Sequence, residues 1–393
     1  MFFSHRDLIA ASSDMAAMAM VALIASFIAS MLIVCTERWH QALSLDQEMS
    51  GAQKFHKKPV PRIGGLALLA GILVVIAYAE WRPSNGHVSG EWKVYLLLVL
   101  AAMPAFISGL LEDLTKGISV RCRLLGTFAS GLIACWLVGA SLPRLDIWGI
   151  DLLFGLTPVA VLATAFAVAG VSNSINIIDG FNGLAGITGV IILTGLGFIA
   201  GQAGDVFVAK LAIVGIGVTI GFLLVNYPTG RIFLGDGGAY LLGFWIAEVA
   251  VLTIARNPSI NAWQILAVCA YPVIEVIYSI YRKKVIRKMN PGVPDRLHFH
   301  MLVYRRFICQ LLPGDGRRSW VRNAMVTCAV VSWTAPLTFI AVYYGDTILR
   351  AMGILAIQLF AYLAFYVRLV RGHWCFNPAV GFGLLPERRT KSH

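Results

Sequence analysis

Long apolar stretches dominate this sequence and limit what it can fold into. A helix that crosses the hydrocarbon core of a bilayer needs about 17–25 mostly apolar residues. Stretches of that length cover residues 15–35, 63–80, 94–111, 124–140, 152–174, 183–201, 207–225, 239–255, 263–281, 324–344 and 347–367. Only 13% of the residues are charged, which is about half the share in ordinary soluble domains. The sequence therefore predicts an all-α integral membrane protein, with about eleven transmembrane helices in a single polytopic domain over residues 1–393.

The basic residues predict which side of the membrane each connection faces. Of the 32 lysines and arginines, 25 lie in residues 36–62, 112–123, 226–238, 282–323 and 368–393. Under the positive-inside rule these segments are cytoplasmic, so the N-terminus is outside and the C-terminus is inside. We expect residues 282–323 to form a basic cytoplasmic loop and residues 371–393 to form a cytoplasmic tail. The net charge of +12 is then mainly a topology signal, and no nucleic-acid partner is expected.

Two segments allow more than one structure. The run 15–35 is long enough to span, which favours a retained first helix over a cleaved signal peptide. Residues 142–150 alternate weakly and allow either a small strand pair or, in preference, an interfacial loop anchored by Trp148.

Two adjacent carboxylates end the third apolar run. Glu112 and Asp113 are followed by three cations, Lys116, Arg121 and Arg123. Carboxylates at a membrane boundary are costly unless they face water or a partner, so they are candidate functional residues. The alternative is an ordinary helix end in which the acids pair with Lys116.

Amides and carboxylates interrupt two later apolar runs. Asn173, Asn176, Asp179 and Asn182 lie within a Gly-rich segment, and Asp236 lies between glycines at the start of the eighth run. Their oxygens are hard ligands of the kind that Mg²⁺ takes, and glycines let backbone N–H groups face an anion. The alternatives are an Asn/Gly turn and an N-capping aspartate.

Two basic clusters complete the set. Lys57 precedes Pro59-Val60-Pro61-Arg62-Ile63-Gly64-Gly65, which is either a substrate-facing loop or a basic membrane anchor. Arg296, His298 and His300 lie in the most basic loop, where no further Cys or His supplies zinc-ligand spacing. An Arg beside imidazoles suits a phosphate or a sugar, whereas a solvated amphipathic stretch is the alternative. Glu248 and Glu275, inside apolar runs, are expected to be buried polar contacts between helices, with a proton or lipid-phosphate role left open.

All five clusters fall on the predicted cytoplasmic side, so we expect the active site on cytoplasmic loops. Together they favour metal-assisted phosphoryl chemistry on a soluble anionic substrate with a membrane-embedded partner. At this level of detail the sequence resembles a known family, the polyprenyl-phosphate N-acetylhexosamine-1-phosphate transferases. The resemblance rests on the ordered motifs Pro59–Gly65, Gly109–Asp113, Asn173–Ala185, Phe233–Gly238 and Pro294–His300.

The resemblance implies an enzyme, a phosphotransferase of the bacterial inner membrane. Its expected reaction uses a UDP-N-acetylhexosamine and undecaprenyl phosphate, releases UMP and starts O-antigen or another surface glycan. It also implies Mg²⁺, with Mn²⁺ as a substitute, held by Asn176 and Asp236, and catalytic roles for Glu112, Asp113 and Asp179. Implied substrate-binding positions are Lys57, Lys116, Arg121, Arg123, Asn173, Asn182, Arg296, His298 and His300. Membrane lipid is a partner, and a homodimer is compatible with the resemblance.

Three positions depart from the pattern of that family. Glu112 stands where Asp is usual, which leaves the base open between Glu112 and Asp113. Asn182 replaces a frequent Asp, and Met301 follows His300 where a further His is common. Two rival functions are a transporter of lipid-linked sugars and a CDP-alcohol type of transferase. The first should show an internal repeat and midplane charges, and the second a DGxxAR motif; neither is evident. The Arg-x-His-x-His loop argues against a third, the muramoyl-pentapeptide transferase of peptidoglycan synthesis.

Overall fold

The apolar stretches form a bundle of long helices. The computed structural model describes residues 5–44, 60–81, 90–290, 292, 297–312 and 319–372, and within them the regular elements are all helices. In chain order these are α1 (His5–Cys35), α2 (Glu37–Ser44), α3 (Gly65–Trp81), α4 (Glu91–Thr115), α5 (Val120–Val138), α6 (Asp151–Phe154), α7 (Thr157–Ile178), α8 (Leu184–Gln202), α9 (Val206–Asn226), α10 (Gly235–Arg256), α11 (Ala262–Val268), α12 (Ala270–Tyr281), the π-helical turn η1 (Arg282–Ile286), α13 (Phe299–Leu302), the π-helical turn η2 (Val303–Ile308), α14 (Cys309–Leu311), α15 (Ser319–Tyr344) and α16 (Ile348–Arg371).

These helices identify a multi-pass membrane protein. Among the described residues, nine helices are long and apolar enough to span a membrane. Helix α3 is apolar but has only 17 residues, and α11 and α12 form a pair bent by 83°. Every predicted stretch is thus helical, whereas the number that cross the bilayer and their orientation stay predictions.

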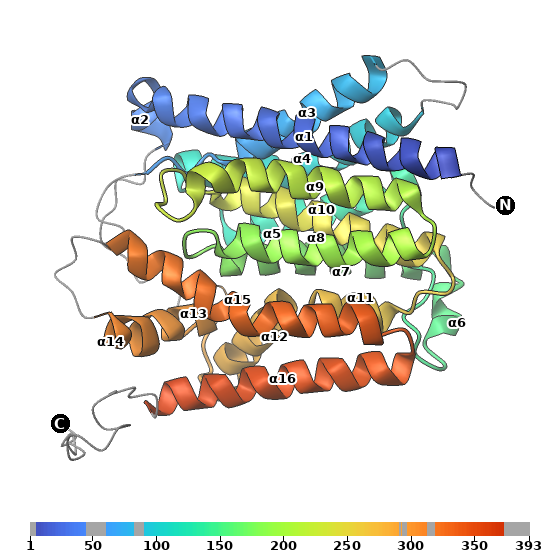
Figure 1. The fold of residues 1–393 in the computed structure, drawn as a ribbon. Coiled ribbons are helices and arrows are strands. Elements are labelled where there is room, and N and C mark those ends of the chain that lie inside the picture. The colour runs from blue at the N-terminus through green and yellow to red at the C-terminus, as the bar shows by residue number, and fades with distance from the viewer. Residues whose placement is uncertain are drawn as a thin grey trace.

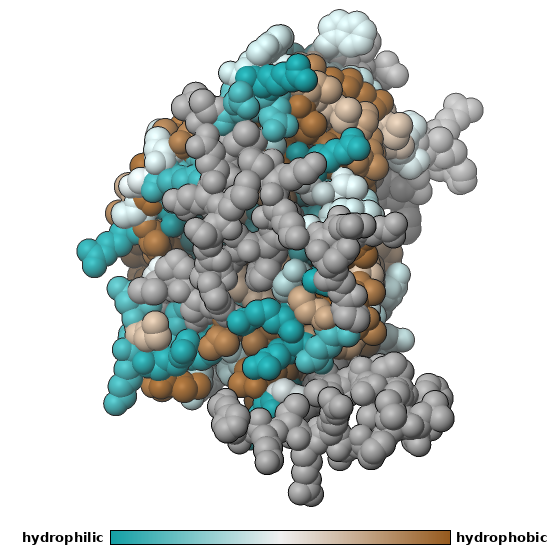
Figure 2. All heavy atoms as spheres, turned by 90° about the vertical axis from the view of Figure 1, so that its left-hand side faces the viewer, coloured by the Kyte–Doolittle hydropathy of each residue, from teal (hydrophilic) through white to brown (hydrophobic). Residues whose placement is uncertain are grey.

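The long helices lie side by side, and the short helices α2, α6, α13 and α14 lie at the two ends of the bundle (Figure 1). Helices α2, α13 and α14 mark one end, and α6 marks the other. The ends of α4 and α7 and the start of α10 all lie at the α2/α13 end, which we call the site end; the α6 end is the far end. Viewed onto the site end, hydrophilic and hydrophobic residues both lie at the surface of the part that the structure describes (Figure 2).

Helix α10 is the centre of the bundle. It packs against α3, α4, α7, α8 and α9, and nearly all of its residues are buried. An all-round apolar helix of this kind is stable only when other helices surround it. Because α10 starts at the site end, its burial fixes the position of Asp236 in its first turn.

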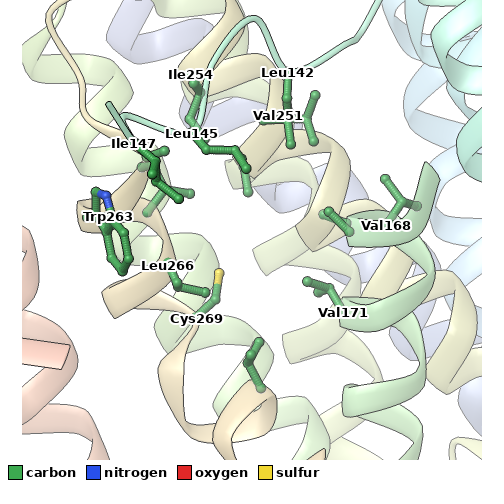
Figure 3. Close-up of a pocket in the computed structure, with 16 residues that line it drawn as sticks. Leu142, Leu145, Ile147, Val168, Val171, Val251, Ile254, Trp263, Leu266 and Cys269 are labelled. Carbon is green, nitrogen blue, oxygen red and sulfur yellow. The ribbon is translucent and has the colours of Figure 1, made fainter. Parts of the chain in front are cut away.

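An apolar cavity of about 240 Å³ lies between α7, α10 and the bent α11–α12 pair (Figure 3). Val168 and Val171 line it from α7, and Trp263, Leu266 and Cys269 line it from the bend. Pro272 lies in the first turn of α12. Because proline has no N–H to donate back to α11, it accounts for a break at this point.

Hydrogen bonds tie the connection between α5 and α6 to the start of α11 at the far end. The Arg144 Nη2 donates to the Pro258 and Ile260 carbonyls at 2.9 and 2.7 Å, and its Nε donates to Asp146 at 2.9 Å. The other Asp146 oxygen accepts the Ala262 N–H at 2.6 Å. This segment contains no strand, and Trp148 is 99% exposed, so the preferred loop structure is confirmed.

Candidate active site

The site is built around the first turn of α10. The Asp113 carboxylate, at the end of α4, accepts the backbone N–H groups of Asp236 at 3.0 Å and Gly237 at 2.9 Å. Asp113 is 4% exposed. Such a carboxylate caps unpaired N–H groups and complements the positive end of the helix dipole. Asp113 therefore sets the position of Asp236.

Glycines allow the helices to come this close. A Cβ on Gly109 of α4 would lie 2.5 Å from the Gly237 nitrogen, and one on Gly65 of α3 would lie 2.5 Å from the Gly238 Cα. Any side chain at these positions would push α10 away, as is typical of close helix packing in membranes. The glycines of the motifs Pro59–Gly65, Gly109–Asp113 and Phe233–Gly238 therefore serve packing at the site.

Two arginines neutralise part of the acidic charge. The Arg62 Nη2 lies 3.8 Å from an oxygen of Asp113 and 3.8 Å from an oxygen of Asp236. Arg123, in the first turn of α5, donates from Nη1 to the other Asp236 oxygen. Four separate segments of the chain thus meet at Asp236.

Asp179 adds a third carboxylate to this group. It caps the C-terminus of α7, and burial raises its pKa to about 7. The positive charge of Arg62 lowers the pKa of Asp179, and the negative charge of Asp236 raises it. The charges of Arg62 and Asp236 therefore act on Asp179, so the motifs Asn173–Ala185 and Phe233–Gly238 meet at one place.

The three predicted asparagines differ in their contacts. Asn176 is partly buried one turn before Asp179. The Asn173 amide donates to the Thr127 hydroxyl at 3.0 Å, which links α7 to α5. Asn182 is 1% exposed, and its amide donates to the Pro228 carbonyl at 2.8 Å. Asn182 thus supports the connection that leads into α10, and a direct role in substrate binding stays a prediction.

Glu112 and Asp113 occupy different surroundings although they are adjacent. Glu112 is partly buried at the end of α4, and its Oε2 accepts the Ile118 N–H at 2.8 Å in the turn between α4 and α5. Asp113 uses both oxygens to cap α10. Lys116 ends α4 with a φ of +54°, and both Lys116 and Arg121 are exposed. Either acid could still be the catalytic base, but only Asp113 bonds to the backbone of α10.

The histidine loop forms a second, more buried part of the site. The rings of His298 and His300 stack with centroids 5.6 Å apart and an interplanar angle of 5°. His300 is fully buried, and neither ring nitrogen has a hydrogen-bond partner among the described residues. Its Nε2 would lie 3.2 Å from a Cβ on Gly180, and its ring meets Phe181 edge-on at 5.8 Å. The histidine loop therefore contacts the Gly180–Phe181 turn after α7.

The oxygen donors fit a divalent metal bound mainly through substrate phosphates. Asp179 and Asp236 repel each other, and Asp236 already shares Arg62 with Asp113, so an added cation would relieve excess negative charge. Within the described ranges, no group of three or more His, Cys, Asp or Glu side chains is placed to hold a metal. Mg²⁺ needs only one or two protein carboxylates when phosphates and water complete its shell.

The sequence did not reveal the roles of two residues, and two of the predicted site residues cannot be compared with the structure. Arg62 was quoted only as part of a motif, yet it contacts two of the acids. Glu275 was expected to be a contact between helices, and it also accepts the His298 Nδ1–H at 2.9 Å. In the sequence, the signal for Arg62 was a lone basic residue before Gly64-Gly65. The signal for Glu275 was a lone acid in an apolar run. Lys57 and Arg296 lie outside the described residues.

Known proteins resemble the chain across these elements. The model of glycosyl transferase family 4 matches residues 95–254, from α4 to α10. A probable undecaprenyl-phosphate N-acetylglucosaminyl 1-phosphate transferase of Bacillus subtilis is 26% identical over 81% of this chain and 88% of its own length. An undecaprenyl-phosphate alpha-N-acetylglucosaminyl 1-phosphate transferase of Yersinia pestis is 30% identical over 64% of this chain and 68% of its own length. The chain belongs to the polyprenyl-phosphate N-acetylglucosaminyl 1-phosphate transferases.

Membership in this family makes the chain an enzyme, a phosphotransferase that transfers a sugar 1-phosphate to a polyprenyl phosphate. The predicted resemblance is thereby confirmed. A phospho-N-acetylmuramoyl-pentapeptide-transferase of a Synechococcus species is also similar, at 32% identity over 58% of this chain and 65% of its own length. The identity of the sugar is therefore a separate question.

Proposed function

We propose that this transferase moves N-acetylhexosamine 1-phosphate from a UDP-N-acetylhexosamine to undecaprenyl phosphate at the bacterial inner membrane. UMP is released, and the lipid product starts O-antigen or another surface glycan. One observation carries the proposal: three carboxylates and two guanidinium groups converge at one end of an apolar helix bundle. That arrangement suits two phosphate substrates, one soluble and one held in the bilayer.

The residues of the site act mainly by positioning and by balancing charge. An oxygen of the lipid phosphate attacks the phosphorus next to the sugar, the bond from that phosphorus to the UMP oxygen breaks, and UMP leaves with the electron pair. Both substrates are anions, so the attack requires neutralisation first. Arg62 and Arg123 supply positive charge, while Asp113 holds Asp236 against them. Bound Mg²⁺, or Mn²⁺ in its place, supplies further positive charge to the donor diphosphate.

The apolar cavity supports the lipid part of the proposal. Val171 of α7 lines the cavity and lies eight residues before Asp179, which is about 12 Å along a helix. Figure 3 shows the aliphatic side chains that point into the cavity from α7 and the bent helix pair. An isoprenoid chain that enters this cavity keeps its phosphate near the end of α7.

The test is direct synthesis with purified protein. Mg²⁺, undecaprenyl phosphate and a panel of radiolabelled UDP-N-acetylhexosamines should give a lipid-linked product and UMP in equal amounts, and EDTA should abolish both. Asp236→Ala should remove turnover without changing the yield of folded protein. Absence of turnover with every UDP-N-acetylhexosamine, or full activity of Asp236→Ala, would overturn the proposal.

The similarity to the Synechococcus protein favours one second candidate, transfer of a phospho-muramoyl-pentapeptide. Its donor is far larger, so the histidine loop would have to leave room for a peptide. His300 is buried against Gly180 and Phe181, so this part of the loop packs directly on the turn between α7 and α8. Adding UDP-muramoyl-pentapeptide to the same panel separates the two functions by kcat/KM.

A further inference from the structure

Glu275 forms the centre of a buried hydrogen-bond network next to the site. It lies in α12 and is fully buried. One carboxylate oxygen accepts the His298 Nδ1–H at 2.9 Å, and the other accepts the Tyr362 hydroxyl of α16 at 2.9 Å. The Phe299 N–H donates to both oxygens at 3.3 Å. A carboxylate inside a bundle is costly unless its oxygens are satisfied in this way.

This network fixes the direction of the His298 ring. Because Nδ1 donates to Glu275, the proton is held on Nδ1, and the opposite ring nitrogen is directed away from α12. The backbone on the other side of His298 is also held: Arg282 and the Tyr366 hydroxyl both donate to the Leu297 carbonyl. Helices α12 and α16 thus hold the short segment 297–299 from two sides.

The position of His298 is passed on to the end of α7. His300 stacks on His298 in nearly parallel planes, and its Nε2 faces Gly180, the residue after Asp179. His300 is buried with neither nitrogen hydrogen-bonded among the described residues, so this ring is available to a ligand at the same place. A shift of His298 would therefore move His300 relative to Asp179.

We propose that Glu275 is a positioning residue for sugar-nucleotide binding, which acts by holding His298 and, through the stacked rings, His300 against the Asp179–Phe181 turn. Tyr362 assists by fixing the carboxylate from α16. The inference rests on the proposed function in one respect: the histidine loop contacts the sugar nucleotide and not the lipid.

The kinetic test compares the two substrates. Glu275→Gln keeps the shape of the side chain but removes its charge, so the KM for the UDP-sugar should rise about tenfold. The KM for undecaprenyl phosphate should stay within about twofold. Tyr362→Phe should raise the KM for the UDP-sugar by a smaller factor. The matched control is Glu248→Gln, another buried carboxyl in the bundle, on α10, which should leave both KM values unchanged.

A double-mutant cycle shows whether Glu275 acts through His298. If it does, the Glu275→Gln/His298→Ala protein should be no worse than His298→Ala alone. A purely structural role predicts equal losses for both substrates and additive effects in the double mutant. Either of these two results, or an unchanged KM for the UDP-sugar in Glu275→Gln, would overturn the inference.

A measurement without substrate separates this inference from the proposed function. Diethyl pyrocarbonate modification of His298, followed by mass spectrometry, should be several times faster in Glu275→Gln than in wild type or Glu248→Gln. If wild type turns over no UDP-sugar, the proposed function fails, whereas this rate still tests the positioning. Equal rates in the three proteins would show that Glu275 does not hold His298.

Discussion

The two ends of the bundle use charged residues in different ways. At the far end Asp205 pairs with Arg256 at 2.6 Å and Asp146 pairs with Arg144 at 2.9 Å, while Asp14 and Glu91 share Lys210 at 3.0 and 2.8 Å. At the site end Asp113 and Asp236 share Arg62, and Asp179 lies in the field of both Arg62 and Asp236. Asp205 and Asp146 are thus each balanced by one arginine, whereas the acids of the site end crowd together.

This difference distinguishes charged residues that hold the structure together from charged residues that bind a ligand. A charged group at a bilayer boundary persists either because it is fully paired or because a ligand completes it. The far-end pairs also bond backbone groups, such as the Ala262 N–H on Asp146, and so they fasten one segment to another. The crowded acids of the site end gain most from an added cation or from a substrate that brings one.

Removal of one acid from each end should give the largest contrast. Asp236→Asn should lower kcat by about 10²–10³-fold, because it removes charge that acts on the phosphates in the transition state. Asp205→Asn should leave kcat within about twofold and lower the free energy of unfolding by about 1–3 kcal/mol. Initial rates and thermal unfolding in detergent measure both. A comparable loss of kcat in Asp205→Asn would end the distinction between the ends.

One arginine from each end, Arg62 and Arg144, allows the same comparison for positive charge. Arg62→Ala should reduce kcat/KM by about 10²-fold, since Asp113 and Asp236 lose the cation that they share. Arg144→Ala should change the melting temperature and not kcat/KM, because its contacts are two carbonyls and Asp146. The steady-state parameters of both proteins at saturating Mg²⁺ are the measurement. If Arg62→Ala is fully active, Arg123 alone is enough to balance the acids.

Sequence alone predicted the helices and the gathering of the polar clusters, because both follow from local pattern. Apolar length gives the spans, and acids placed at the ends of alternate apolar runs meet at one end of the bundle. The roles of Arg62 and Glu275 could not be predicted, since they depend on the approach of α3 to α10 and of α12 to α16. The sequence also did not distinguish Asp113 from Glu112; only the packing of α4 against α10 shows which carboxylate caps the helix.

A glycine substitution tests whether the site end depends on the close approach of α4 to α10. Gly109→Ala places a methyl group 2.5 Å from the Gly237 nitrogen, so α4 and α10 must separate. We expect a loss of about 1–3 kcal/mol in unfolding free energy, together with reduced kcat, because Asp113 moves relative to Asp236. A Cβ on Gly353 of α16 would meet no described atom within 4 Å, so Gly353→Ala should be neutral or slightly stabilising. Equal melting temperatures for both variants would contradict the close packing.

The smallest expected effect is a pH-dependent stability confined to the site end. Burial lowers the pKa of His300 to about 3, so the folded protein holds this ring neutral where the unfolded chain, with a pKa of 6.5, takes up a proton. The contribution of His300 to stability should therefore fall by about 1 kcal/mol between pH 7.5 and pH 6, while Asp179, whose pKa folding raises from 3.8 to about 7, contributes a change of similar size and opposite sign. His300→Gln, which does not titrate, should lose this part of the slope, whereas Asp205→Asn should keep it. Thermal unfolding of the three proteins at both pH values decides the matter: if His300→Gln follows wild type, the pH response arises elsewhere in the bundle.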